Sequence, residues 1–583
     1  MDKRNTVEND LQNGISRFAA RLNYLRGKSK KLSWYRLSIF FISFILFFYF
    51  FFSGSTLPLY LTIAVFFILF GILTGIHNKL ESGIRRNIVW TNIKKVHIAR
   101  MNLQWDELPP SLFNPDRKHP FEFDLDVTGE YSLHRLINTA ESIEGSSILR
   151  DWLISINPDS DVIEKRQLIV KELAALNRFR DKLSLNSKLL SKKELKGTKI
   201  LDWINTPAEY DKIRRILLLL FVIIPVNIVF FILFILNILP AYFAFISLLY
   251  ISVHWINGKY VTGNFEELLE IEDEFGKFSV LFDFLEKYPY RKDSYLQKFC
   301  LPFIKNSPSG EFRKIKSILN AIGITRNPLV ALVLNAIFPY NFFFALKLEK
   351  VKLSVKDELP VWLNTWYELE AYNSLANYAY LNPQCAFPVI TDGHSCSFTA
   401  EGISHPLIRF ENNIPNYFAI NNRSEVFIIT GSNMSGKSTF LKTIGTNLVL
   451  AYAGGVVNAD KLNSSLFRIF CCINISDSVI DGISYFYAEV KRLKHLLNEL
   501  NNFDSYPVLF LIDEIFRGTN NVERLKGSRS YIKEAVKLNG AGIVSTHDLE
   551  LARLAEEITS VKNYHFREEA VEAKMIFDYK IHP

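Results

Sequence analysis

The chain has 583 residues, which is too long for one compact core and therefore predicts two or more domains. Its formal net charge of +8 fits a nucleic acid and an anionic membrane surface equally well, so charge alone selects neither partner. The cysteines have no C-x-x-C spacing, so neither a zinc site nor a disulfide framework is indicated and we expect reduced, buried thiols. They are Cys300, Cys385, Cys396, Cys471 and Cys472.

Two apolar hairpins are predicted in the first half of the chain. The first joins the runs 37–52 and 57–76 through a tight turn, and the second joins 216–239 and 241–256. A helix crosses a bilayer with about 20 apolar residues, so each hairpin is long enough to be a pair of membrane spans. Pro225 would kink the third run, which membrane helices tolerate. Buried helices of a soluble core remain the alternative for both hairpins.

Basic residues flank these runs, whereas the turns inside each hairpin carry no charge. The flanking residues are Arg21, Arg26, Lys28, Lys30, Lys31, Arg36, Lys79, Arg85, Arg86, Lys94, Lys95, Lys212, Arg214 and Arg215. The positive-inside rule then predicts a multi-pass protein of the inner (cytoplasmic) membrane, with both termini and all soluble parts in the cytoplasm. A fifth apolar stretch, Pro328–Leu346, is interrupted by Asn335, Pro339 and Asn341, and we interpret it as a core helix.

A phosphate-binding loop is predicted between a short strand and a helix. Val426–Thr430 is typical of a buried strand, and Phe440–Tyr452 has the pattern of a helix. The segment between them fits G-x-x-x-x-G-K-[ST], whose backbone N–H groups and helix dipole hold phosphate oxygens. Lys437 would reach the β- and γ-phosphates of ATP, and Ser438 would ligate Mg²⁺. The predicted nucleotide-binding residues of this loop are Gly431, Ser432, Asn433, Met434, Ser435, Gly436, Lys437, Ser438 and Thr439.

Two later apolar strands end in polar residues. Val508–Ile512 is followed by Asp513 and Glu514, as in a central parallel strand whose carboxyl end faces a ligand crevice. Asp513 would hold Mg²⁺, and Glu514 would orient and deprotonate the attacking water. The next strand ends before His547, which would contact the γ-phosphate or that water. The predicted catalytic residues are thus Glu514, His547 and Lys437, although a solvated acid pair and a structural histidine remain alternatives.

Taken together, these segments resemble the MutS family of DNA mismatch-repair ATPases. The resemblance is carried by residues 430–439 (TGSNMSGKST), 512–520 (IDEIFRGTN) and 545–547 (STH). Residues 403–408 and 413–416 are similar to the segment that opens the family's ATPase domain, and residues 468–489 resemble the stretch that includes its signature loop. Further upstream, residues 123–173 resemble the start of its helical core-and-lever domain.

The resemblance implies a multidomain fold, with an α-helical core and lever domain and a C-terminal α/β P-loop ATPase domain of the ABC class, to which the apolar runs add two transmembrane hairpins. We expect a basic N-terminus with hairpin 1 at 1–80, a linker at 81–120, helical parts at 121–211 and 258–385, hairpin 2 at 212–257 and the ATPase domain at 386–583. It also implies a homodimer through the ATPase domain, in which Ser484 reaches the nucleotide of the opposite subunit.

Several positions depart from the family pattern. Ser435 and Phe516 stand where glycine is common, and Asn413 stands where an adenine-stacking aromatic residue is common. Tyr417, Phe418 or Tyr579 could supply that stacking, and Tyr579 is our choice for the nucleotide-binding set. No mismatch-reading domain precedes the helical part, and the second hairpin occupies the place where the lever helices would run to a DNA clamp.

The sequence therefore predicts a membrane-anchored MutS-like ATPase that requires Mg²⁺ and couples hydrolysis to movements of its helices. The resemblance implies DNA as a partner, in mismatch repair or recombination. Because no reading element is evident, DNA binding should be weak, directed to the backbone and steeply salt-dependent. An ABC-type transport ATPase, and a nucleotide-gated membrane scaffold that does not bind DNA, remain alternatives, although an L-S-G-G-Q signature is missing from the sequence.

Overall fold

The computed structural model describes residues 2–190, 197–207, 209–258, 272–392, 396–474, 485–517, 519–571 and 574–583. It divides into two compact units. The first comprises residues 1–140, 146–185 and 371–583, and the second comprises residues 141–145 and 186–370. A mostly helical region precedes a C-terminal α/β domain, in agreement with the predicted fold class. Each unit is described separately below.

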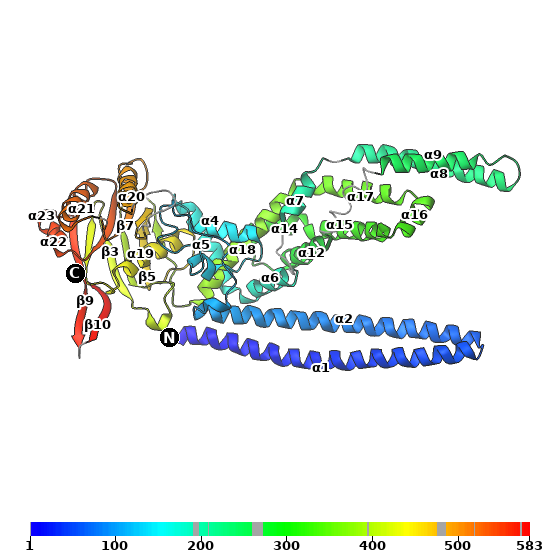
Figure 1. Cartoon of the computed structure of the whole chain (residues 1–583), viewed down its shortest axis with the longest axis horizontal. Coiled ribbons are helices and arrows are strands. Elements are labelled where there is room, and N and C mark those ends of the chain that lie inside the picture. The colour runs from blue at the N-terminus through cyan, green and yellow to red at the C-terminus, as the bar shows by residue number, and fades with distance from the viewer. Residues whose placement is uncertain are drawn as a thin grey trace. The chain divides into compact units, whose positions relative to one another are not determined.

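The first unit begins with an antiparallel pair of long helices, α1 (Asp2–Phe52) and α2 (Thr56–Met101), which run side by side (Figure 1). The turn between them falls at the predicted position. The helices extend well beyond the apolar runs, so the first part of the predicted linker at 81–120 is helical up to Met101. At the base of the pair, Leu11 and Met101 pack with Leu381 in a small buried cluster.

Short elements follow in the same unit: η1 (Trp105–Glu107), α3 (Leu133–Ile137), α4 (Ile143–Leu153), α5 (Ser160–Ala175) and the first part of α6 (Asn177–Leu190). The apolar spacing of residues 133–153 is typical of a helix, but the structure interrupts the helix after Ile137. Asn138 explains the break, because its side chain accepts a hydrogen bond from the Ala140 backbone (3.0 Å) and donates one to Ser146 Oγ (2.8 Å). Asparagine favours such local turns over a continuing helix.

The second unit is helical throughout its described part. Its elements are the end of α6, α7 (Gly197–Asn205), α8 (Tyr210–Ile235), α9 (Phe243–Asn257), α12 (Glu272–Lys287), α13 (Tyr295–Phe299), α14 (Leu301–Asn306), α15 (Pro308–Gly323), η2 (Ile324–Arg326), α16 (Pro328–Ile337), α17 (Tyr340–Val355) and the start of α18 (Glu358–Leu381). Its core is aromatic: Phe278 lies against Phe282, Phe312 and Trp366, all fully or almost fully buried. Helices α8 and α9 form the second predicted hairpin (Figure 1).

The interpretation of Pro328–Leu346 as one core helix is wrong. The segment forms two helices, α16 and α17, which are separated at Phe338 and Pro339. Proline cannot donate a backbone hydrogen bond and disfavours a helical residue before it, which explains the break. Moreover, the aliphatic side chains of α16 are largely exposed rather than buried.

Among the described residues, three helices are long and apolar enough to cross a membrane by length and composition, namely α1, α2 and α8. The bent pair of α15 with η2 and α16 passes the same test when its two parts are taken together. The most apolar 18-residue windows of α1 and α2 are 0% buried, and that of α8 is 17% buried. Helix α9 is apolar but shorter. Helix α8 continues through Pro225 without interruption.

The C-terminal domain contains two sheets. The smaller has the order β1-β5-β2-β3, and the larger has the order β10-β9-β4-β8-β7-β6. The strands are β1 (Val389–Thr391), β2 (Phe398–Ile403), β3 (Asn416–Ile420), β4 (Val426–Thr430), β5 (Lys461–Ser465), β6 (Arg468–Cys472), β7 (Val508–Asp513), β8 (Gly540–Thr546), β9 (Val561–Val571) and β10 (Lys574–His582). The connecting helices are η3 (Phe410–Asn412), α19 (Lys437–Tyr452), α20 (Tyr485–Leu500), α21 (Asn521–Ala535), α22 (Leu549–Ala552) and α23 (Leu554–Glu557).

Five strands of the larger sheet are parallel, and β10 alone runs antiparallel to its neighbour. Strands β4, β7 and β8 are buried along their whole length, as their apolar runs predict. In the pairing register Thr430 lies beside Thr546, and Asp513 lies beside Ser545. The carboxyl ends of the three strands therefore meet at one edge of the sheet, where the predicted site residues follow.

Candidate functional site

A glycine-rich loop, Gly431–Gly436, connects β4 to α19. Gly436 has a φ of 105°, a conformation that side chains with a Cβ disfavour, and a Cβ there would lie 3.2 Å from Tyr579 Cδ1. The loop closes on the first residue of α19, since Lys437 Nζ donates to the carbonyl oxygens of Gly431 and Ser432, each at 2.7 Å. The ammonium group thus lies inside a ring of backbone atoms at the positive end of a 16-residue helix.

Asp513, the last residue of β7, contacts side chains from two other elements through its carboxylate. Its Oδ2 accepts a hydrogen bond from Ser438 Oγ of α19 at 2.7 Å, and its Oδ1 accepts one from Ser545 Oγ of β8. Arg517 Nη2 lies 3.4 Å from Oδ2. The carboxylate is almost fully buried and is held by a hydroxyl from each side, which fixes its position relative to the loop.

Glu514 follows directly and is held between two basic side chains. Arg517 Nε donates to Glu514 Oε2 at 2.7 Å, and His547 Nδ1 lies 3.3 Å from Oε1. The backbone of Glu514 has a φ of 52°, and its N–H donates to Ser545 O at 3.0 Å. A non-glycine residue in this conformation costs about 1 kcal/mol or more, and such strain is concentrated at functional sites.

The charges around the site shift two pKa values. Burial works to raise the pKa of Glu514, but Arg517 and His547 outweigh it and lower that pKa below its ordinary value. Burial lowers the pKa of Lys437, and the carboxylates of Glu514 and Asp513 offset this only in part. Glu514 is therefore ionised at neutral pH, as a proton acceptor must be.

A cavity of about 960 Å³ opens over the loop. Its wall combines Lys437 and Ser438 of α19 with Glu514 and Arg517 beyond β7, and with Phe577, Asp578 and Tyr579 of β10. On the side near the smaller sheet it is lined by His405 and Asn413, which exchange two hydrogen bonds of 3.1 and 2.8 Å through the Asn413 side chain. Burial lowers the pKa of the His405 imidazole to about 3, so this side chain brings no charge to the cavity wall at neutral pH.

The structure brings most of the predicted site residues to this cavity. Asn433, Met434, Gly436, Lys437, Ser438, Thr439, Glu514 and Tyr579 line it. Gly431 and Ser432 belong to the same loop, as does Ser435, which is buried beneath it. Asp513 and His547 are joined to the lining residues by the contacts described above. Ser484 lies outside the described residues.

Of the aromatic residues considered for base stacking, only Tyr579 lines the cavity. Phe418 is unsuitable, because it is fully buried and its ring packs against Phe427 and Phe440. Tyr417 is exposed but is not among the lining residues.

Sequence reasoning missed Arg517 and Ser545 as members of the site. Arg517 lies inside the segment 512–520, three residues after Glu514. An arginine so close to two consecutive acidic residues could have been predicted to pair with them. Ser545 carried a weaker signal, since only the pairing register of β7 and β8 places it beside Asp513.

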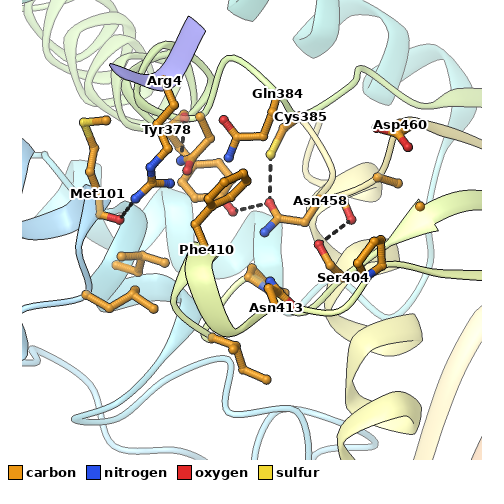
Figure 2. A pocket seen from close by; sticks show the side chains of 18 of the residues that line it. Arg4, Met101, Tyr378, Gln384, Cys385, Ser404, Phe410, Asn413, Asn458 and Asp460 are labelled. Carbon is orange, nitrogen blue, oxygen red and sulfur yellow. Dashed lines mark hydrogen bonds between the residues drawn. The ribbon is translucent and has the colours of Figure 1, made fainter. Parts of the chain in front are cut away.

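A second, smaller cavity of about 370 Å³ lies close by in the same unit (Figure 2). Figure 2 shows Tyr378 and Cys385 directed at the side chain of Asn458, with donor–acceptor distances of 2.8 and 2.9 Å. Arg4 of α1 reaches into it, donates to Met101 O and lies 5.1 Å from the ring centre of Phe410. Both cavities are lined by Ile408 and Asn413, so the base of the N-terminal helix pair adjoins the larger cavity.

Comparison with known proteins supports the resemblance seen in the sequence. Residues 427–583 match the family model of MutS domain V. The chain is 33% identical over 201 residues to the DNA mismatch repair protein MutS of Chlorobium chlorochromatii, and 28% identical over 224 residues to that of Staphylococcus haemolyticus. It is 34% identical over 166 residues to mouse (Mus musculus) MutS protein homolog 4.

These matches cover 33%, 37% and 28% of this chain, but only 22%, 24% and 17% of the three relatives. The similarity thus concerns a fraction of those proteins, and the family model matches the part of the chain that holds β4 to β10 and the larger cavity. The C-terminal part of the chain, residues 427–583, is therefore similar to MutS domain V.

Proposed function

We propose that the C-terminal domain binds ATP and hydrolyses it to ADP and phosphate. The observation that carries this proposal is the convergence of Lys437, Ser438, Asp513 and Glu514 at the carboxyl edge of the parallel sheet. Open parallel sheets bind ligands at this edge, and a loop before a helix N-terminus is suited to phosphate.

In this proposal Lys437 exchanges its two carbonyl partners for phosphate oxygens. The carbonyl contacts at 2.7 Å hold the ammonium group inside the loop, so little rearrangement is needed when an anion enters. Tyr579 offers an aromatic face at the cavity wall for the base.

Mg²⁺ fits the donor set that the site offers. The Ser438 hydroxyl and the Asp513 carboxylate are hard oxygen donors that lie 2.7 Å apart, and such oxygens are the preferred ligands of this ion. When bound with ATP, Mg²⁺ neutralises negative charge on the phosphates. Ser545 and Arg517 keep the carboxylate of Asp513 oriented towards Ser438.

Glu514 is proposed as the general base that takes a proton from the attacking water, with His547 as the neighbouring polar group. In the described structure Arg517 and His547 occupy both carboxylate oxygens. Each carboxylate oxygen can accept a second hydrogen bond, so a water can approach Glu514 beside these partners. An incoming phosphate is a competing anionic partner for the Arg517 guanidinium.

The assembly proposed for this activity is a homodimer formed through the ATPase domain, with Ser484 reaching the nucleotide of the partner. DNA is a proposed partner, supported by the similarity to DNA mismatch repair proteins. A weak contact to the DNA backbone should weaken steeply as salt is raised.

A membrane anchor is also proposed, with α1–α2 and α8–α9 as hairpins and the remaining parts in the cytoplasm. Its support is the length and apolar composition of these helices and their exposed surfaces. The charge-free hairpin turns and basic flanks favour the inner membrane with cytoplasmic termini.

The test is hydrolysis by the detergent-solubilised full chain and by its Glu514→Gln and Lys437→Ala variants. Glu514→Gln should reduce kcat by about 10²- to 10⁴-fold, because a general base contributes that much, while ATP binding persists. Lys437→Ala should lose ATP binding itself. As a control, Lys442→Ala removes a lysine of the same helix that bonds Asp126 instead (2.6 Å). Equal turnover of Glu514→Gln and the unsubstituted chain would remove Glu514 from the mechanism.

A further inference from the structure

An uncharged stretch of the second unit is unlike the rest of its surface. Residues 318–346 contain a single charged side chain, Arg326, whereas Lys314 and Lys316 precede the stretch and Lys347 and Lys350 follow it. The stretch forms the end of α15, then η2, α16 and the start of α17. Helices α15 and α16 meet at an angle of 110°, so the chain turns sharply here and comes back.

One face of α16 is aliphatic and exposed. Leu329, Leu332 and Ile337 are 73%, 69% and 72% exposed, and Val333 is 56% exposed. The last three follow Leu329 by three, four and eight residues, which places all four side chains on one side of the helix. Asn335, the polar residue of α16, is buried instead. A soluble surface helix shows the reverse arrangement, with its apolar side inward.

Helix α16 packs against the second half of α9 and the middle of α8. Asn335 O accepts a hydrogen bond from Tyr250 of α9, and Asn335 Oδ1 lies 3.2 Å from His254 Nε2. The Phe338 ring lies 5.6 Å from that of Phe221 in α8. At 1.5 Å per residue, these contacts lie about 10–20 Å from the hairpin tip, which is inside a hydrocarbon layer of about 30 Å.

Several backbone groups at the two ends of α16 have hydrogen-bond partners. Asn327 Oδ1 accepts from the N–H groups of Leu329 and Val330 at the start of the helix. At its end Phe338 N donates to Leu334 O at 3.0 Å, and Asn341 N donates to Asn335 Oδ1 at 3.1 Å. Tyr340 Oη closes the turn by donating to Ala321 O of α15 at 3.0 Å. Non-helical backbone is tolerated at membrane depth only when its polar groups are satisfied in this way.

We propose that the α15–α16–α17 turn is a re-entrant membrane element. It enters the bilayer beside the α8–α9 hairpin and leaves on the same side, and α16 presents Leu329, Leu332, Val333 and Ile337 to lipid acyl chains. Lipid is the occupant that fits, because this face is wholly aliphatic, lies in a stretch with a single charged side chain and belongs to a helix that contacts α8, whose apolar side chains are also exposed. Arg326, at the turn before α16, is long enough to extend towards the headgroups.

This inference rests on the proposed membrane anchor, and the experiment separates the two. The full chain is reconstituted in lipid nanodiscs with a spin label at Leu332→Cys, and in separate samples at Val229→Cys of α8 and Leu549→Cys of the ATPase domain. Leu549 is 72% exposed, so it matches Leu332 in exposure but not in surroundings. Accessibility to oxygen, which concentrates in lipid, is compared with accessibility to a water-soluble nickel complex.

We expect labels at Leu332 and Val229 to be open to oxygen and shielded from nickel, and the label at Leu549 to show the reverse. A nickel-accessible Leu332 beside a lipid-exposed Val229 would overturn the re-entrant element and leave the anchor intact. Nickel access at both positions would overturn the anchor as well. Shielding of Leu332 from both reagents would identify a protein contact and so reject lipid as the occupant. Ile337→Cys, on the same face, repeats the measurement if Leu332→Cys expresses poorly.

Discussion

At the level of single residues, Arg517 sets the state of the proposed base. Its guanidinium contacts both Asp513 and Glu514, and it is the largest influence that lowers the pKa of Glu514. Removing it in Arg517→Ala leaves burial to raise that pKa. Because Glu514 acts only when ionised, the acidic limb of the pH profile of kcat/KM should move to higher pH.

The matched control for this measurement is Arg529→Ala. Arg529 forms an ion pair with Glu557 in the same domain, not with Glu514. Its removal should therefore leave the pH profile of kcat/KM unchanged. An unchanged acidic limb in Arg517→Ala would mean that Glu514 does not govern the profile.

Gly542 of β8 makes room for the ring of Phe510 on the neighbouring strand. A Cβ at Gly542 would lie 2.1 Å from Phe510 Cε2, and Phe510 is buried in the core of the domain. Gly542→Ala should therefore destabilise the domain by about 1–3 kcal/mol through overpacking, seen as a lower midpoint of thermal unfolding. Gly27→Ala in α1, where nothing lies within 4 Å, should be neutral or stabilising. Equal midpoints for the two variants would argue against a rigid contact between β7 and β8.

At the level of elements, Arg4 ties the start of α1 to the end of α2 and to η3. Its guanidinium donates to Met101 O, lies 3.4 Å from Asn102 Oδ1 and stacks near Phe410. Hydrogen bonds to charged groups contribute about 1.5–3 kcal/mol, so Arg4→Ala should loosen this junction. Hydrogen–deuterium exchange of peptides that cover residues 2–12 and 98–103 should become faster.

Arg21, an exposed arginine of the same helix, supplies the comparison for this experiment. Exchange in Arg21→Ala should match that of the unsubstituted chain. If Arg4→Ala also leaves exchange unaltered, the buried contacts of Leu11 and Met101 hold the junction without the arginine.

The elements that the sequence predicted well are those encoded by local patterns. The run Val426–Thr430, the loop after it and the acids after Ile512 all have the expected order of strand, loop and helix or strand end. Contacts between distant residues could not be predicted. Arg4 and Met101 are 97 residues apart, and the exposure of α16 depends on its packing against α9. Asn138 and Pro339 did carry local signals for breaks, but the apolar spacing around them outweighed these signals.

At the level of the whole molecule, the fold shields the cysteine thiols from solvent. Cys300, Cys396, Cys471 and Cys472 are buried, and burial raises the pKa of Cys300, Cys385, Cys396 and Cys472 to about 12. Since the thiolate is the reactive form, the folded chain should react very slowly with a disulfide reagent at pH 8. In denaturant all five thiols should react within minutes, which a colorimetric titration measures. Rapid reaction of one thiol in the folded chain would show that its surroundings open.

Tyr579 lines the larger cavity from β10, a strand that is synthesised after both apolar hairpins. Residues 37–76 and 216–256 leave the ribosome long before residue 579, and chains fold from the N-terminus during synthesis. Insertion of the hairpins into a bilayer would therefore be finished before the nucleotide compartment is closed. ATP could then act on the chain only after it is already anchored, so biogenesis itself would restrict hydrolysis to the membrane surface.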